Sequence, residues 1–212
     1  MARRILIVTG VQAEADAIGK PSGTFVVVGG IGKTNAAAAT TAAVLSDGPF
    51  RWIINAGVAG ALPESELSIG DIVIANKCVY FEEGLITPDG FQNIEEMGFS
   101  LGNFLGNYVP VDSWMLERLS EIGKVAPVAT VATCSGTNEQ AKLVKERTGC
   151  LCEAMEGAAV VHAANRLSAP AIEIRAISNT TGDRNNQEWD IKLALDNLGK
   201  AVNDSINALW SE

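Results

Sequence analysis

Two glutamate residues in this sequence are well placed to bind or act on a ligand. Glu14 follows the apolar run Ile5–Val8, and Glu156 lies in Met155–Ala164, a stretch that is otherwise small and apolar. A carboxylate without a partner in such surroundings is costly, so we expect Glu156 to meet a hydrogen-bonding partner or a ligand. Glu14 on its own is also typical of a solvated carboxylate or of the first turn of a helix.

A glycine-rich segment, Gly30-Ile31-Gly32-Lys33-Thr34, resembles part of a nucleotide-binding P-loop. The full motif requires a glycine at position 27, where this sequence has Val27. No predicted strand ends in the acidic residue that would hold magnesium, so a P-loop is not expected. The segment remains suited to a polar or anionic ligand at the start of a helix, or equally to a tight strand-to-helix turn.

The remaining reactive side chains give little support to metal or nucleophilic chemistry. His162 is the one histidine, and it lies too far around a helix from Glu156 to face the same site. We predict a helix-face residue rather than a catalytic base. The four cysteines include no CxxC pair and are predicted to be small core residues. No metal and no cofactor is expected.

Composition excludes several classes of protein. Of the 212 residues 47% are hydrophobic, which rules out a largely disordered chain. The net charge of −9 has the wrong sign for binding nucleic acid or an anionic membrane surface. Ile5–Val8 is too short for the core of a signal peptide, and no apolar run approaches a membrane span. We therefore expect a soluble cytoplasmic protein.

Short β-branched runs alternate with alanine-rich segments, which predicts one α/β domain over residues 1–212 with a central, mostly parallel or mixed sheet. Strands are predicted at 5–8, 25–28, 52–55, 71–75, 128–133 and 171–177, and helices at 33–45, 113–122, 138–147, 155–166 and 188–209. In such sheets ligands bind beyond the carboxyl ends of the strands. Glu14 and the segments 29–32, 55–60 and 178–179 should therefore converge at one edge.

Residues 82–108 break this pattern. The segment has five glycines, four phenylalanine or tyrosine residues and few periodic positions. A structureless stretch of this length in a compact domain is usually functional or poorly ordered. We predict an excursion from the sheet that forms a lid or a subunit contact, with a surface loop as the alternative.

Four motifs occur in order along the chain: Gly30-Ile31-Gly32-Lys33, Asn55-Ala56-Gly57-Val58-Ala59-Gly60, Met155-Glu156-Gly157-Ala158-Ala159 and Arg175-Ala176-Ile177-Ser178-Asn179. Together they resemble the purine nucleoside phosphorylase/nucleosidase superfamily, from Ile5 to the C-terminal helix. Within it the resemblance is closest to the futalosine hydrolase family, through Ser178–Arg184 and the insert that contains Gly90-Phe91-Gln92. The resemblance implies a three-layer fold with a mixed sheet between helices.

The resemblance also implies roles for individual residues in cleaving an N-glycosidic bond. Glu14 would orient and deprotonate the attacking water, and Asn179 would face the purine. Met155 would pack under the sugar, and Glu156 would accept hydrogen bonds from the ribose hydroxyls. The backbone of Ala56, Gly57 and Val58 would line the sugar and the base. Ser135 and Gly136 would hold the edge of the purine.

Two departures from the superfamily pattern favour one reaction over others. Asn55 stands where hexameric phosphorylases have an arginine that holds phosphate, so water is the expected nucleophile. Asn179 stands where adenine-specific nucleosidases have an aspartate. Its amide can donate to a 6-oxo group and accept from N7–H, which suits hypoxanthine.

The predicted reaction is therefore hydrolysis of futalosine to hypoxanthine and dehypoxanthine futalosine, in menaquinone biosynthesis. The alternatives are a 5′-methylthioadenosine/S-adenosylhomocysteine nucleosidase, a related purine nucleoside phosphorylase, or a nucleoside-binding protein without activity. The family implies a homo-oligomer. The 5′ substituent of the nucleoside has no assigned partner, although Arg184 and Lys33 are candidates for its carboxylate.

Overall fold

The computed structural model describes residues 4–211, so the first three residues and the last residue of the predicted 1–212 domain lie outside it. The strands of the main sheet are β1 (Ile5–Thr9), β2 (Thr24–Val28), β3 (Trp52–Ala61), β4 (Ile72–Tyr80), β7 (Tyr108–Pro110), β8 (Lys124–Thr130), β9 (Cys152–Ala154) and β10 (Ala171–Thr180). A separate hairpin consists of β5 (Gly84–Thr87) and β6 (Gly90–Asn93). The helices are α1 (Gln12–Ile18), α2 (Lys33–Asp47), α3 (Ser113–Leu119), α4 (Asn138–Thr148), α5 (Gly157–Arg166) and α6 (Ile191–Trp210).

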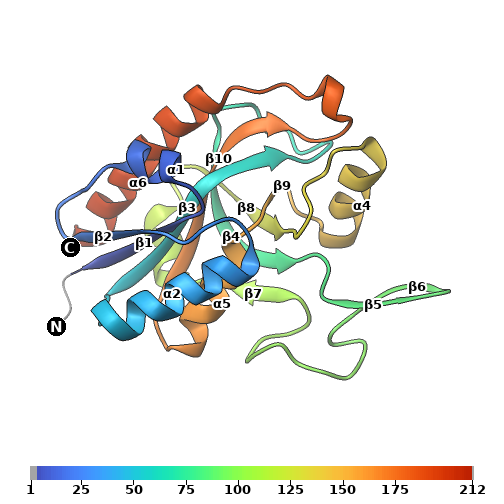
Figure 1. Ribbon diagram of the computed structural model, residues 1–212, viewed down its shortest axis with the longest axis horizontal. Coiled ribbons are helices and arrows are strands. Elements are labelled where there is room, and N and C mark those ends of the chain that lie inside the picture. Colours follow the sequence, from blue (N-terminus) through green and yellow to red (C-terminus); the bar gives the residue numbers. More distant parts are fainter. Residues whose placement is uncertain (1–3, 212) are drawn as a thin grey trace.

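The main sheet is mixed and partly closed on itself (Figure 1). β1 pairs in parallel with both β2 and β3, and β10 lies parallel to β3 but antiparallel to β4. β4 also pairs with β8, β8 pairs with β9, and β9 pairs with the end of β3. The predicted mixed α/β sheet is confirmed, and the far end of β3 is shared by β10 and β9.

Helices cover both faces of the sheet, and β1 shows why. Leu6 and Val8 point into a core shared with α2 and α5, whereas Ile5 and Ile7 point into a second core shared with α6. A strand buried on both faces reads as a continuous apolar run, as Ile5–Val8 does.

β4 extends to Tyr80 instead of the predicted 75, and two further strands are also longer than the sequence predicts. β3 extends from the predicted 52–55 to Ala61, and β10 from the predicted 171–177 to Thr180. Alanine and glycine have low strand propensity, but here neighbours on each side supply the hydrogen-bond partners. Segments 55–60 and 178–179 therefore lie inside strands rather than beyond the strand ends, where we predicted them.

A β-bulge lies near the end of β10. Ile177 pairs with Ala59 of β3 and Asn179 pairs with Gly60, so Ser178 is an extra residue between two consecutive partners. Because paired residues point to the same face, the bulge turns Asn179 to the face opposite that of Ile177 and Arg175. Arg175 and Asn179, both on β10, thus point to opposite faces of the sheet.

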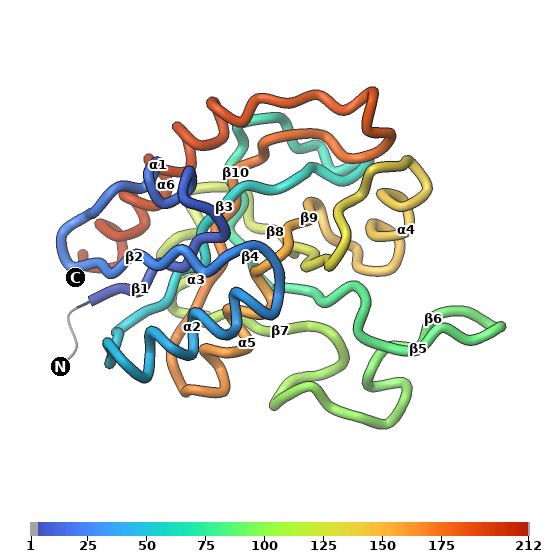
Figure 2. Tube along the Cα trace, in the orientation of Figure 1, coloured from blue at the N-terminus to red at the C-terminus, as the bar shows by residue number. Residues whose placement is uncertain are grey.

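The 82–108 segment leaves the sheet after β4 and returns at β7, as the green tube in Figure 2 shows. Its hairpin β5–β6 projects away from the body of the molecule (Figure 1). The Arg147 guanidinium of α4 lies 4.3 Å from the ring centre of Phe81 and 4.0 Å from that of Phe91, which attaches the hairpin to α4.

Candidate active site

Glu14 is buried in the first turn of α1, where three backbone N–H groups hold its carboxylate. Oε2 accepts from Gly10 N at 2.8 Å and from Val11 N at 3.1 Å, and Oε1 accepts from Val58 N at 2.9 Å. The sequence expectation of a first-turn glutamate is met, and the carboxylate is bound from two segments of the chain. It is fixed in position and retains lone pairs for a further donor.

Arg175 of β10 is the centre of a buried ionic cluster. Its Nε donates to Glu173 Oε1 at 2.7 Å, and its Nη1 lies 3.5 Å from Glu156 Oε2. Nη2 donates to the amide oxygen of Asn55. Burial lowers the pKa of Arg175, but the carboxylates of Glu173, Glu156 and Glu14 outweigh it and raise that pKa above its ordinary value. The guanidinium therefore stays charged and compensates several buried carboxylates at once.

Gly57 is the residue of β3 that allows this cluster to form. A Cβ at this position would lie 2.6 Å from Glu14 Oε1 and closer still to the guanidinium of Arg175. Any side chain larger than hydrogen would push the two groups apart. The Gly57 position that we predicted to line the sugar is thus required by the packing of Glu14 against Arg175.

Glu156 binds the glycine-rich turn that the sequence singled out. It occupies the N-cap position of α5, and its Oε1 accepts from Gly32 N at 3.0 Å, at the start of α2. Gly32 has φ +92°, a conformation that glycine adopts without strain. The anionic ligand expected at this turn is, in the described chain, the carboxylate of Glu156 itself.

The structure brings Glu14 and Glu156 together around Gly10. A Cβ on Gly10 would lie 3.4 Å from Glu156 Oε1 and 3.5 Å from Glu14 Oε2. Met155 is half-buried beside Glu156. Of the β3 residues, Ala56 packs its side chain into the core, and Val58 contributes its N–H to Glu14. The predicted site residues near the sugar therefore share one region at the carboxyl edge of the sheet.

Asn179 and Ser135 lie farther along, at the shared end of β3. The Asn179 amide donates to Thr180 O at 2.8 Å and accepts from the Ser178 hydroxyl at 2.8 Å. The Ser135 N–H and hydroxyl both donate to Glu153 of β9, at 2.6 and 2.7 Å. Gly136 is exposed, and its carbonyl accepts from Arg184 N at 3.0 Å.

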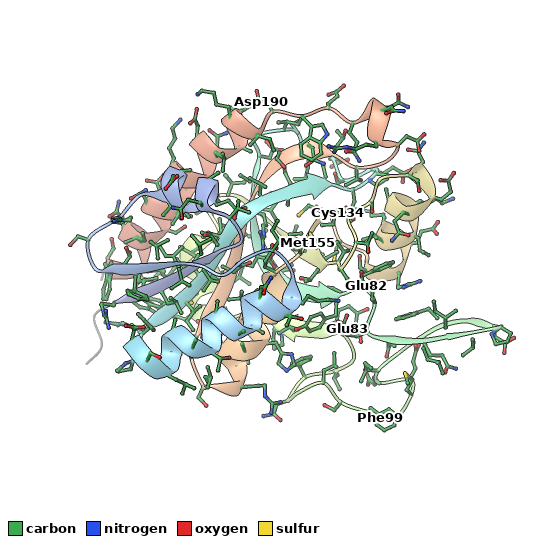
Figure 3. All side chains as sticks on the ribbon, viewed as in Figure 1. Glu82, Glu83, Phe99, Cys134, Met155 and Asp190 are labelled. Atoms are coloured by element: carbon green, nitrogen blue, oxygen red, sulfur yellow. The ribbon has the colours of Figure 1, made fainter. Side chains whose placement is uncertain are left out.

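A second charged group lies at the edge of this region. Lys33 Nζ lies 3.0 Å from Glu82 Oε2 and 2.8 Å from Glu83 Oε1; Figure 3 labels both glutamates. Burial lowers the pKa of Lys33, but the two glutamates outweigh it and raise that pKa. Lys33, a candidate partner for a substrate carboxylate, is thus engaged by two carboxylates of the protein.

His162 and the cysteines mostly take the structural roles expected of them. His162 Nδ1 lies 3.3 Å from the Tyr80 hydroxyl, and its ring packs edge-on against Phe104. Cys78, Cys150 and Cys152 are buried, but Cys134 is exposed, so the prediction of a core residue was wrong there. It follows β8 in a polar loop, where the apolar pattern has already ended. Partial desolvation of its thiol, together with the nearby charges of Glu153, Glu156 and Glu82, raises the pKa of Cys134 to about 11.

Neither a metal-binding cluster nor a membrane-spanning helix is found within residues 4–211. No group of three or more His, Cys, Asp or Glu side chains in this range could hold a metal ion. No helix in the same range has the length and apolar composition needed to cross a membrane.

The sequence prediction missed Arg175 and Glu173 as members of the site. A signal was present, because the two charges alternate with Ile172, Ile174 and Ala176 in an apolar strand. Charged residues at this spacing point to one face, and a buried charge requires a partner.

This arrangement can be compared with known proteins. A family model described as the phosphorylase superfamily matches residues 7–211. The chain belongs to the phosphorylase superfamily. The futalosine hydrolase of Streptomyces coelicolor is 31% identical over 93% of each chain. A 5′-methylthioadenosine/S-adenosylhomocysteine nucleosidase of a Marinomonas species is 28% identical over 85% of this chain and 80% of its own length.

The superfamily fold is also evident in three dimensions. The native structure of futalosine hydrolase from Helicobacter pylori covers 98% of each chain with a TM-score of 0.81 and 16% identity. At this identity the likeness shows the fold. The resemblance inferred from the four sequence motifs is confirmed.

Proposed function

We propose that this superfamily member hydrolyses the N-glycosidic bond of futalosine, releasing hypoxanthine and dehypoxanthine futalosine, in the cytoplasm and in menaquinone biosynthesis. The observation that carries the proposal is the composition of the cluster around Glu14. Asn55, at the position of the phosphate-binding arginine of hexameric phosphorylases, donates to Val8 O and accepts from Arg175. Arg175 is in turn occupied by carboxylates. The cluster therefore suits a neutral nucleophile, which is water.

The chemistry follows from the two carboxylates near Gly10. Glu14 takes a proton from the attacking water as the water bonds to the anomeric carbon. Glu156 accepts hydrogen bonds from the ribose hydroxyls, and these strengthen as positive charge develops on the sugar. Met155 packs under the ribose, and the backbone of β3 lines it. The bonding electrons leave with the base, which takes up a proton from solvent to become hypoxanthine, and Glu14 returns to solvent the proton that it took from the attacking water.

The identity of the base is supported by Asn179. Its amide carries both a donor and an acceptor, which match O6 and N7–H of a 6-oxopurine. The relatives named futalosine hydrolase point to the same base class.

An assay of purified protein tests the proposal directly. Futalosine and inosine are incubated with and without phosphate, and hypoxanthine is followed. We expect futalosine cleavage that does not depend on phosphate. 5′-Methylthioadenosine and S-adenosylhomocysteine serve as further substrates in the same assay. Strict phosphate dependence, or faster cleavage of the adenine nucleosides, contradicts the proposal.

Asn179→Asp is expected to alter which base is accepted. An ionised aspartate faces the 6-oxo group acceptor to acceptor, whereas it can accept from a 6-amino group. Loss of one buried hydrogen bond to the base, with an unpaired acceptor left behind, lowers kcat/KM for futalosine by at least about tenfold. The measurement is the ratio of kcat/KM for futalosine to that for 5′-methylthioadenosine, with Asn186→Asp as the matched control. An unchanged ratio would place base discrimination elsewhere.

We further propose that the protein is a homo-oligomer whose contact includes the 82–108 segment. Phe99 and Leu105 of this segment are 68% and 73% exposed, and Ile31, at 56%, lies beside the turn that binds Glu156. Exposed apolar side chains around a site are typical of a subunit interface. Sedimentation velocity at micromolar concentration should show a dimer or larger species, which Leu105→Asp with Phe99→Asp shifts to monomer. A monomeric wild type contradicts this prediction.

A further inference from the structure

Glu153 is a buried carboxylate that the proposed mechanism does not use. It lies on β9 between Cys152 and Ala154, which pack into the core, and is 4% exposed. Within residues 4–211 no lysine or arginine forms an ion pair with it. Burying a carboxylate without a cation is costly, so its hydrogen bonds must carry the compensation.

Both of those hydrogen bonds come from one residue. Ser135 donates its N–H to Oε1 at 2.6 Å and its hydroxyl to Oε2 at 2.7 Å. A serine that gives both protons to one carboxylate is fixed in backbone and in side-chain orientation. Ser135 is 3% exposed, whereas Cys134 and Gly136 on either side of it are exposed. The carboxylate therefore anchors the middle of an otherwise open loop.

Ser135 also joins this loop to the segment that follows Asn179. Its carbonyl accepts from Gln187 Nε2 at 2.9 Å, and the same amide donates to Gly182 O at 2.9 Å. The next carbonyl, of Gly136, accepts from Arg184 N. The anchored loop and the 182–187 segment thus hold each other in place.

The sheet register places Glu153 across from Asn179. Gly60 of β3 pairs with Glu153 on one side and with Asn179 on the other. Laterally paired residues point to the same face, and two strand spacings separate the outer pair by about 9.6 Å. Gly60 between them has no side chain. Asn179 and the Glu153–Ser135 pair thus stand on two sides of one glycine.

We propose that Glu153 is a positioning residue for the base: by accepting both protons of Ser135, it fixes the 134–137 loop as the wall opposite Asn179. The proposal rests on the proposed function, since it takes the ligand between these walls to be the purine of the nucleoside. It assigns Glu153 to binding of the base and leaves activation of water to Glu14.

Ionisation of Glu153 should then govern binding of the base. The titratable groups that interact with it are Glu82 after β4, Cys134 of the anchored loop and Cys152 of β9. Burial raises the pKa of Glu153, partly opposed by the two Ser135 hydrogen bonds. Below that pKa the carboxyl carries a proton and can no longer accept from both donors. KM for futalosine should therefore increase as the pH falls through the pKa of Glu153.

Two variants and a control test the assignment. Glu153→Gln keeps the shape but offers one acceptor and an NH₂ group, and Ser135→Ala removes one donor. Glu146→Gln, on the exposed face of α4, is the control. We expect KM for futalosine and the hypoxanthine Kd to increase about tenfold in both site variants, because each weakens a charge-assisted hydrogen bond. kcat should stay within about threefold of wild type, and the acid-side increase in KM should disappear in Glu153→Gln.

The outcomes separate this inference from the proposed function. Unchanged KM and Kd in Glu153→Gln, or a fall in kcat at constant KM, overturns the positioning role while futalosine cleavage by the wild type stands. A wild type that does not cleave futalosine overturns the function instead. Hydrogen exchange of the 132–137 amides then still tests the anchor, which predicts faster exchange in Glu153→Gln than in Glu146→Gln. Equal exchange in the two variants overturns it.

Discussion

Glu14→Gln is expected to reduce kcat for futalosine by about 10²–10⁴-fold, the usual contribution of a well-placed general base. The amide is isosteric, and its oxygen can still accept from Val58 N or from Gly10 N. The pocket should therefore keep its shape while losing the group that takes the proton from water. Steady-state release of hypoxanthine measures the effect.

The matched measurement is the affinity for hypoxanthine by calorimetry, which should change little because Glu14 does not face the base. Asp16→Asn, on an exposed position of the same helix, serves as the control for an added amide. Near-normal futalosine turnover in Glu14→Gln would remove Glu14 as the base.

Arg175→Met should destabilise the folded protein by about 3–5 kcal/mol, the usual cost of removing one partner from a buried ion pair. The substitution leaves the carboxylates of Glu173, Glu156 and Glu14 without their shared cation. Glu173 is fully buried, and one of its oxygens already has no hydrogen-bond partner. Urea denaturation of the variant and the wild type measures the loss in the free energy of unfolding.

A second substitution distinguishes lost charge compensation from lost packing. Arg175→Lys keeps a cation beside Glu173 and Glu156, so it should destabilise the protein less than Arg175→Met does. Lys142→Met, at an exposed ion pair of α4, should change stability by less than about 0.5 kcal/mol. An equal loss of stability in Arg175→Lys and Arg175→Met would contradict the electrostatic account.

Most of the architecture could be predicted because the cores leave a strong pattern in the sequence. Ile5–Val8 is apolar throughout since both of its faces are buried, and the alanine-rich α2 begins at Lys33 as predicted. The ends of β3 and β10 could not be predicted in the same way. Their residues beyond Asn55 and Ile177 are mostly small or polar, and it is pairing with distant strands that makes them extended.

The candidate site was predictable to the extent that single residues stand out. Glu156 was identified because a carboxylate is conspicuous in an apolar stretch, and Glu14 because it follows the first predicted strand and matches the family resemblance. The binding of Glu156 to Gly32 joins residues 124 positions apart, and a local pattern does not contain such a contact. The Ser135–Glu153 pair was missed for the same reason, since each residue alone resembles an ordinary polar position.

The bulge at Ser178 has a consequence for how this enzyme could be redesigned or could diverge. If Ser178 paired regularly with Gly60, Asn179 would point to the face that carries Arg175, and any change of its side chain would disturb the packed ions. With the bulge, β10 places Arg175 and Asn179 on opposite faces, so that either side chain can be changed independently of the other. A library at Asn179, the residue proposed to read the base, can therefore search for new nucleobase preferences while the buried ionic cluster keeps the chain folded.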